Sequence, residues 1–222
     1  MSFWPVAQGW SAALSLPWLA ARPDVDLVSL TRRGSSVTGH QVDFEQLCLA
    51  PASVLGPLAP AGIDVAISCL GTTIRAAGSE QAMFRVDHDY ILGLASGARA
   101  LGARQFILMT SVGAGGPGFY LKTKGAIEEA VGHLGFDRLD LIRPGELVGH
   151  RAEQRPLETI GQRVLAVLAP LMAGPFARYT AIPADTVADA ILALIGQPET
   201  GRHVHENDGL RRDGTGNRST SG

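Results

Sequence analysis

Short apolar runs rich in β-branched residues alternate along the chain with stretches in which apolar residues recur every three or four positions. The first pattern is typical of a buried strand and the second of a helix that packs on a sheet. Strands are predicted at 25–30, 64–71, 104–111, 137–145 and 202–207. Helices are predicted at 120–133, 157–169 and 184–195, and another is capped by Ser79 and places Met83, Val86, Tyr90 and Leu94 on one face.

This alternation predicts βαβ units, and therefore a doubly wound parallel sheet with helices on both faces. Such sheets bind ligands at the carboxyl ends of their strands. The segments to inspect are therefore those that follow the predicted strands, at 31–34, 71–73, 110–113 and 143–149. We expect a single domain over residues 1–209. The polar tail 210–222 has no periodicity, so we expect it to be disordered.

Composition agrees with a single globular domain and narrows its partners. Of the 222 residues, 45% are hydrophobic and 18% charged, which is enough apolar material for a substantial core. The net charge is −2 and no long basic run occurs, so we expect a small-molecule substrate and no nucleic-acid partner. Cys48 and Cys69 are not in a CxxC pattern, and we expect reduced thiols. No carboxylate-rich or cysteine-rich segment accompanies His203 and His205, so no metal site is predicted.

The first twenty residues, MSFWPVAQGWSAALSLPWLA, are strongly apolar. They make a poor secretory signal, because no Lys or Arg precedes the apolar part and polar residues interrupt it. They also make a poor membrane span, since no uninterrupted apolar run reaches about 18 residues. We therefore expect a soluble, cytoplasmic protein that does not act at a membrane.

The stretch FYLKTKG at 119–125 carries the strongest candidate chemistry. Tyr120 and Lys124 are four residues apart and so share one face of a helix. A free phenol ionises only near about pH 10, and a neighbouring ammonium stabilises the phenolate so that the pair can exchange a proton nearer neutrality. Upstream, a predicted strand ends in Thr110 and Ser111, and a hydroxyl there can donate to a substrate carbonyl. The set predicts carbonyl reduction or alcohol oxidation.

Other residues point to a dinucleotide. Arg32 and Arg33 follow the strand whose end faces the adenosine ribose in such sheets, where an arginine accommodates a 2′-phosphate, so NADP is favoured over NAD. Gly71 ends a buried strand and lets the backbone approach a flat ligand, with Leu70 and Thr72 beside it. Asp43 is a weaker candidate for contact with the adenine edge. Surface charge and an ordinary turn remain alternative explanations for these residues.

Several motifs occur together in an order that resembles a known family. They are DVAISCLGTT (64–73), RVDHDY (85–90), YLKTKGAIEE (120–129), DRLDLIRPGELVG (137–149) and RAEQRP (151–156). Their combination resembles the Tat-interacting-protein group of atypical short-chain dehydrogenases/reductases, over about residues 25–207. The resemblance implies a Rossmann fold with a small C-terminal substrate-side portion, and binding of NADP(H).

The resemblance also implies an active site of Tyr120 and Lys124 with a hydroxyl from Thr110 or Ser111, and both hydroxyls remain candidates. Lys124 then also holds the nicotinamide ribose, and the turn at Pro144 passes beside the nicotinamide. Members of this group include regulators without a defined substrate. Two functions therefore remain open: an NADP-dependent oxidoreductase acting on a small carbonyl or alcohol, and a non-catalytic NADP(H)-sensing or protein-binding regulator.

The start of the chain departs from the family pattern. A Gly-x-Gly-x-x-Gly loop is expected there to hold the pyrophosphate, but only Gly9 is present and the bulky Trp10 follows it. The first strand and its loop are thus degenerate. Reading the back-translated codons of residues 3–12 two bases further on gives, with permissible synonymous codons, an apolar strand and a Gly-x-Gly-x-x-Gly loop. Residues 1–14 are either a frame-shifted translation or a divergent start, which the coding DNA distinguishes.

Overall fold

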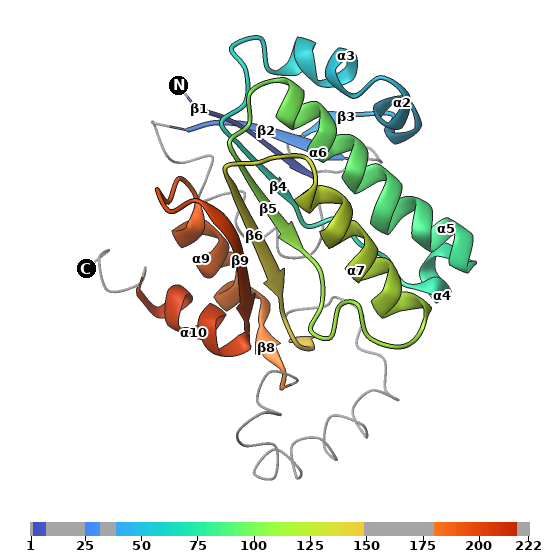
Figure 1. Cartoon of the computed structure of the whole chain (residues 1–222), viewed down its shortest axis with the longest axis vertical. Coiled ribbons are helices and arrows are strands. Elements are labelled where there is room, and N and C mark those ends of the chain that lie inside the picture. The colour runs from blue at the N-terminus through green and yellow to red at the C-terminus, as the bar shows by residue number, and fades with distance from the viewer. Residues whose placement is uncertain (1, 8–24, 32–38, 149–179, 217–222) are drawn as a thin grey trace.

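The computed structural model describes residues 2–7, 25–31, 39–148 and 180–216 (Figure 1). Seven strands form one sheet in the order β3-β2-β1-β4-β5-β6-β9, and every neighbouring pair is parallel. The strands are β1 Ser2–Ala7, β2 Val25–Thr31, β3 His40–Gln41, β4 Val65–Ser68, β5 Gln105–Met109, β6 Arg138–Arg143 and β9 Gly201–Glu206. The predicted doubly wound parallel sheet is confirmed.

The N-terminal strand β1 lies in the middle of this sheet. It pairs with β2 over all six of its residues, and with β4 at Val6 and Ala7. Pro5 removes one hydrogen-bond donor from a strand with neighbours on both sides, which makes it an unusual central strand. Pairing through main-chain groups still forms the strand despite its degenerate sequence. The expected glycine loop, including Gly9 and Trp10, lies outside the described residues.

Helices connect the strands on both faces of the sheet (Figure 1). Their bounds are α2 Phe44–Leu49, α3 Pro51–Leu55, α4 Ile74–Ala77, α5 Glu80–Phe84, α6 Tyr90–Ala100, α7 Phe119–Gly132, α9 Ala184–Leu194 and α10 Asn207–Gly216. A 3₁₀ turn spans Gly56–Leu58, and a separate parallel pair joins β7 Leu147–Val148 to β8 Ile182–Pro183. The helix predicted at 157–169 lies outside the described residues.

Alternation along the strands divides the core into two layers. On β5, Phe106 and Leu108 pack with α6 and α7, whereas Ile107 packs on the other face with α9. All three side chains are fully buried. Because successive strand residues point to opposite faces, a sheet covered on both sides needs apolar residues at both positions, as the sequence of β5 has.

The helical stretch predicted after Ser79 is present but is not uniform. The Ser79 hydroxyl accepts a hydrogen bond from the Ala82 amide at 3.0 Å, which confirms the predicted cap. Between α5 and α6 the chain widens into a π-helical turn over Arg85–Asp89. Such turns inside helices are frequent at functional sites, since they reorient one side chain relative to the rest of the helix.

The prediction that residues 210–216 belong to a disordered tail is wrong. These residues form most of α10, which packs on α9 and buries Leu210 completely. The sequence favoured disorder because the segment is polar and holds glycines, which are poor helix formers. Packing overrides this preference: a Cβ on Gly214 would lie 2.7 Å from the Thr186 carbonyl oxygen, so the glycine permits the two helices to approach closely. Residues 217–222 lie outside the described part.

Both cysteines are free thiols in the structure. Cys69 is buried at the end of β4, and burial raises the pKa of its thiol to about 12. Within the described ranges, no helix is long and apolar enough to cross a membrane. The same part of the chain holds no group of three or more His, Cys, Asp or Glu side chains arranged around a potential metal position.

Candidate functional site

The carboxyl ends of β4, β5 and β6 lie side by side, and most predicted site residues follow them directly. Gly71 follows β4, Ser111 follows β5, and Pro144 follows β6. Two of these ends are joined through the main chain, because the Val112 amide donates to the Pro144 carbonyl at 3.0 Å. This edge of a parallel sheet is where such folds bind their ligands.

Helix α7 brings Tyr120 and Lys124 to the same edge. The Lys124 ammonium lies 5.6 Å from the centre of the Tyr120 ring, as the four-residue spacing predicts. Lys124 is 3% exposed, while Tyr120 is only half-buried. An ammonium withdrawn from water acts more strongly on its neighbours than one in solvent.

Asp87 is a site residue that the sequence analysis missed. Its Oδ2 lies 2.8 Å from Lys124 Nζ, and the two side chains are 0% and 4% exposed. Its Oδ1 accepts a hydrogen bond from the Thr72 amide at 2.7 Å. Asp87 belongs to the π-helical turn, which is how a helix residue comes to face the end of β4. The available signal was an acidic residue on the otherwise apolar face that includes Met83.

Gly71 provides the space in which this ion pair sits. A Cβ at Gly71 would lie 3.3 Å from Lys124 Nζ and 3.7 Å from Asp87 Oδ2. Thr72 supplies the amide that binds Asp87, and Leu70 is buried beneath the turn. The predicted residues Leu70, Gly71 and Thr72 are thus brought together with Lys124.

The two candidate hydroxyls lie in different environments. Thr110 is buried, and its hydroxyl donates to Glu128 Oε1 at 2.7 Å. Ser111 is half-buried, and within the described residues its hydroxyl donates to the Val112 carbonyl, at 3.3 Å. Thr110 has the same parity along the strand as Phe106, which faces α7, so its direction follows from the pleat. Of the two hydroxyls, that of Ser111 is the more accessible.

Glu128 is the centre of a buried charge cluster directly below the site. One helical turn after Lys124, it is 2% exposed and accepts a hydrogen bond from Arg143 Nε at 2.9 Å. Arg202 of β9 approaches its Oε2 at 3.3 Å. The hydrogen bonds that Arg143 donates to Glu128 raise the pKa of its guanidinium. The cluster joins α7 to the ends of β5 and β6, and so fixes the positions of the elements that carry the candidate site residues.

The predicted adenosine end is less complete. Asp43 is exposed and caps α2, since its Oδ1 accepts a hydrogen bond from the Glu45 amide at 2.9 Å. Capping is the role that the structure shows for Asp43. Arg32 and Arg33 lie outside the described residues, so the structure does not place them relative to Asp43.

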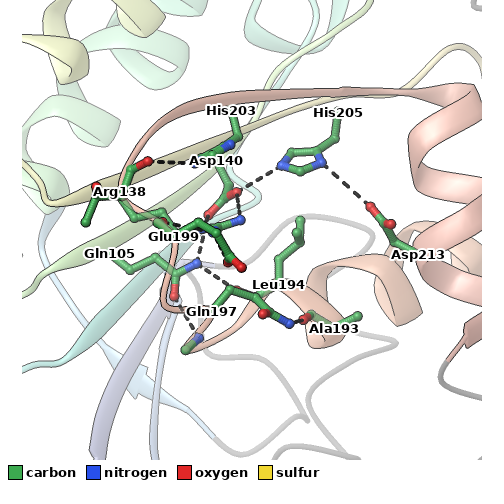
Figure 2. A network of polar contacts seen from close by, with 12 residues as sticks. Gln105, Arg138, Asp140, Ala193, Leu194, Gln197, Glu199, His203, His205 and Asp213 are labelled. Carbon is green, nitrogen blue, oxygen red and sulfur yellow. Dashed lines mark hydrogen bonds and ion pairs between the residues drawn. The ribbon is translucent and has the colours of Figure 1, made fainter.

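A second polar network lies away from this edge, on the face of the sheet covered by α9 (Figure 2). Asp140 of β6 is fully buried and accepts hydrogen bonds from Arg138, Gln105 and His205. Burial by itself would raise the pKa of Asp140, but the hydrogen bonds from His205, Arg138 and Gln105 together lower it. His205 also lies 3.7 Å from Asp213 of α10. The network joins the last strand and last helix to the middle of the sheet.

Comparison with known proteins gives relatives of two kinds, while no family model matches the chain. Protein HTATIP2 from Rattus norvegicus is 38% identical over 172 residues, which cover 76% of this chain and 66% of the rat protein. Protein fmp52, mitochondrial, from Emericella nidulans is 42% identical over 113 residues, or 50% of this chain and 48% of the fungal protein. The chain therefore spans only about one half to two thirds of the length of these relatives.

Solved structures agree with the fold. A short-chain dehydrogenase/reductase superfamily protein from Agrobacterium tumefaciens, crystallised with bound NAD, superposes with a TM-score of 0.66. The superposition covers 90% of this chain and 76% of that protein at 15% sequence identity, so it speaks for the fold alone. The fold and the relatives together define a class of α/β proteins built on a doubly wound parallel sheet. Within that class, the chain belongs to the atypical short-chain dehydrogenase/reductase group that includes the Tat-interacting protein.

The expectation of a cytoplasmic protein is wrong on this comparison. Several fungal relatives, from Emericella nidulans, Aspergillus niger and Candida albicans, are named as mitochondrial proteins. The expectation rested on the lack of a secretory signal and of a membrane span. Neither feature distinguishes the cytoplasm from the mitochondrion.

Proposed function

We propose that this protein is an NADP-dependent oxidoreductase that interconverts a small carbonyl compound and its alcohol. The observation that carries the proposal is the position of Lys124: buried, ion-paired to Asp87, against Gly71 at the end of β4, and one turn from Tyr120. A lysine whose only role is to charge the surface would be exposed to water. Lys124 is instead buried at the edge of the sheet where such folds bind their ligands. The neighbour of the same fold that was crystallised with NAD supports this class of ligand.

The residues present fit a nicotinamide group at this edge. Gly71 has no side chain, which leaves room for the Lys124 ammonium at the end of β4, and Leu70, Thr72 and Pro144 lie at the same edge of the sheet. Lys124 would hold the ribose hydroxyls through its ammonium, while Asp87 fixes the position of that ammonium. When bound, the cofactor supplies or accepts the hydride.

The protein's own side chains supply the proton. In reduction, the Tyr120 hydroxyl gives its proton to the substrate oxygen as the carbonyl carbon receives the hydride, and the phenolate that remains is stabilised by the Lys124 ammonium. The Ser111 hydroxyl donates a hydrogen bond to the same oxygen and stabilises its developing negative charge. Thr110 is assigned a structural part, because its hydroxyl is bound to Glu128.

At the adenosine end, we assign the 2′-phosphate to Arg32 and Arg33 and the adenine edge to Asp43. Two arginines and no acidic residue follow β2 in the sequence. A guanidinium favours a phosphate, whereas the free ribose hydroxyl of NAD suits a carboxylate. Replacing both arginines by alanine should weaken binding of NADPH but not of NADH.

A second function is favoured by one observation, the single Gly9 where three glycines are expected. A weakened pyrophosphate site suits a non-catalytic regulator that senses NADP(H) or binds a protein. Turnover distinguishes the two functions, because a sensor would bind cofactor without reducing any carbonyl.

The test is a titration of the chain with NADPH, followed by turnover on a panel of small aldehydes and ketones. Tyr120→Phe should lower turnover by about a hundredfold or more, since general acid catalysis contributes roughly 10²–10⁴-fold, and should leave NADPH affinity nearly unchanged. Tyr90→Phe is the matched control, because the Tyr90 hydroxyl contacts Glu45 on the far side of α6. Absence of NADPH binding by the chain and by a version with a restored glycine loop would overturn the proposal.

A further inference from the structure

The loop between β5 and α7, residues 110–118, joins Ser111 to Tyr120 and consists almost entirely of glycine, alanine, valine and proline. Three of its glycines, Gly113, Gly115 and Gly118, have φ angles of 80°, 84° and 87°. Side-chain-bearing residues rarely adopt this left-handed conformation, so the path of the loop depends on glycine. The loop is therefore shaped by its backbone, and the question is what holds it in place.

Main-chain hydrogen bonds fix the loop near its start and at its middle. Near its start, the Val112 amide donates to the Pro144 carbonyl at 3.0 Å, and the Ala114 amide donates to the Ser111 carbonyl at 3.1 Å. At its middle, the Gly115 amide donates to the Leu121 carbonyl at 2.8 Å. Leu121 is the residue after Tyr120, so this last bond ties the loop directly to the helix turn that carries the candidate acid.

The hydrogen bond between Gly115 and Leu121 can form because α7 has no side chain at Gly125, where the loop crosses the helix. A Cβ added at Gly125 would lie 2.6 Å from Gly115 Cα and 2.7 Å from Gly115 N. Real Cβ atoms do not come this close to backbone atoms, so any side chain at position 125 must push Gly115 away from α7. The main-chain nitrogen of Gly115, which would be displaced, is the donor of the hydrogen bond to the Leu121 carbonyl. A shift of Gly115 would move Ala114, and the hydrogen bond from the Ala114 amide to the Ser111 carbonyl would then move Ser111 as well.

We propose that Gly125 is a positioning residue: its missing side chain lets the 110–118 loop rest on α7 at Gly115, and this contact sets where Ser111 lies relative to Tyr120. The importance of that placement for turnover rests on the proposed oxidoreductase function. The contact itself does not, and it is tested separately.

The chain offers a matched control on the same helix. Gly132 also lies in α7, and a Cβ there would meet no atom within 4 Å. Replacing a helical glycine by alanine ordinarily stabilises a helix, because glycine loses more conformational freedom on folding. If the contact at Gly115 had no consequence, Gly125→Ala and Gly132→Ala would both stabilise the protein.

The first measurement is amide hydrogen exchange of residues 110–118, compared in wild type, Gly125→Ala and Gly132→Ala. Wild type and Gly132→Ala should protect the Gly115 amide, whereas Gly125→Ala should speed its exchange by about tenfold or more. Equal protection in the two variants, or an unprotected Gly115 amide in wild type, overturns the proposal. Should Gly125→Ala fail to fold, Gly116→Ala disturbs the loop from its own side, since its Cβ would lie 2.8 Å from the Gly113 carbonyl oxygen. It should raise exchange in the same residues.

The second measurement separates positioning from cofactor binding. With NADPH and a small aromatic aldehyde such as 4-nitrobenzaldehyde, Gly125→Ala should lower kcat by about tenfold or more, because misplacement by a fraction of an ångström is costly in catalysis. Its Kd for NADPH should stay within about twofold of wild type. An unchanged kcat beside faster exchange refutes the link to Ser111. If wild type itself shows no turnover, the oxidoreductase function fails, while the exchange result still decides the contact.

Discussion

At the scale of single residues, the Asp87 carboxylate and the Lys124 ammonium face each other in a place almost closed to water. Such a pair is a weak source of net stability, because both charges lose their hydration. Removing one partner is a different matter, since the other charge is then left buried and unpaired. The pair therefore makes each residue depend on the other.

Asp87→Asn should destabilise the fold by about 3 kcal/mol and weaken NADPH binding, because Lys124 loses the charge that holds it. Asp89→Asn is the control within the same π-helical turn. Asp89 pairs with Arg85 where both side chains are partly exposed, and such pairs contribute less than about 1 kcal/mol. Urea unfolding of both variants makes the comparison, and equal losses would contradict a special part for Asp87.

Thr110 and Ser111 should respond to substitution in opposite ways. Thr110→Val leaves Glu128 without one buried donor and should cost about 1–3 kcal/mol of stability with little effect on turnover. Ser111→Ala should leave stability unchanged and lower turnover by about a hundredfold, as expected for a donor to the reacting oxygen. Thermal unfolding and steady-state kinetics on both variants test this, and a reversed pattern would assign the active hydroxyl to Thr110.

Sequence alone predicted some of these residues because their relation is local. Tyr120 and Lys124 are one helical turn apart, so spacing is sufficient to pair them. Asp87 reaches Lys124 across 37 positions of the chain, and only the fold brings them together. Sequence alone left both Thr110 and Ser111 as candidates for the active hydroxyl. Only the structure shows that Glu128 of α7 faces Thr110 and accepts its hydrogen bond.

At the scale of elements, the start of α10 holds the segments that lead into the paired strands β7 and β8. Asn207 is fully buried, accepts a hydrogen bond from the Gly145 amide at 2.9 Å, and donates to the Thr180 carbonyl at 2.6 Å. Gly145 precedes β7 and Thr180 precedes β8. The first residue of α10 thus fixes the turn beside Pro144 and the paired strands where residues 149–179 leave and return.

Asn207→Ala should cost about 2 kcal/mol, because it removes two hydrogen bonds of a fully buried side chain, to the partly buried Gly145 amide and Thr180 carbonyl. Asp208→Ala alters the next residue of α10, which is exposed, and should cost less than about 1 kcal/mol. Thermal unfolding of the two variants provides the measurement. A loss no larger for Asn207→Ala than for Asp208→Ala would show that the turn is held by other contacts.

Strands β2, β4, β5 and β6 and helix α7 were predictable because their apolar patterns reflect burial in the sheet and against it. Helix α10 was not, since its sequence, NDGLRRDGTG, holds a single large apolar residue. What stabilises α10 is Leu210 in the core and the close approach at Gly214, and both depend on the surface of α9. The π-helical turn likewise follows from packing and has no periodic pattern of its own.

At the scale of the whole molecule, the Asp140 network makes stability depend on pH. The pKa of Asp140 is lowered in the folded state, so the folded protein binds this proton less readily than the unfolded chain. The stability that Asp140 contributes is therefore fully present above about pH 5. It falls as the pH passes the ordinary value of 3.8 and is lost below the lowered pKa.

Asp140→Asn should accordingly reduce the slope of unfolding free energy against pH in the acid range, besides lowering stability near neutrality by about 3 kcal/mol. Asp137→Asn removes an exposed ion pair with Arg104 and should leave the slope as in wild type. Urea unfolding at a series of pH values between about 3 and 7 checks both expectations. Identical slopes in wild type and Asp140→Asn would place the acid sensitivity in other carboxylates.

The hydrogen bonds that Asn207 makes with Gly145 and Thr180 also affect the order in which the fold can form while the chain is being synthesised. Strands β4, β5, β6 and β9 lie across the sheet in the order in which a ribosome makes them, so each can dock on the edge left by the one before. Tyr120, Lys124 and Asp87 can meet once β6 has formed. The turn beside Pro144 must wait until residue 207 has left the exit tunnel. A growing chain can thus bring Tyr120, Lys124 and Asp87 together well before the neighbouring turn is secured, and both are in place only after residue 207 has emerged.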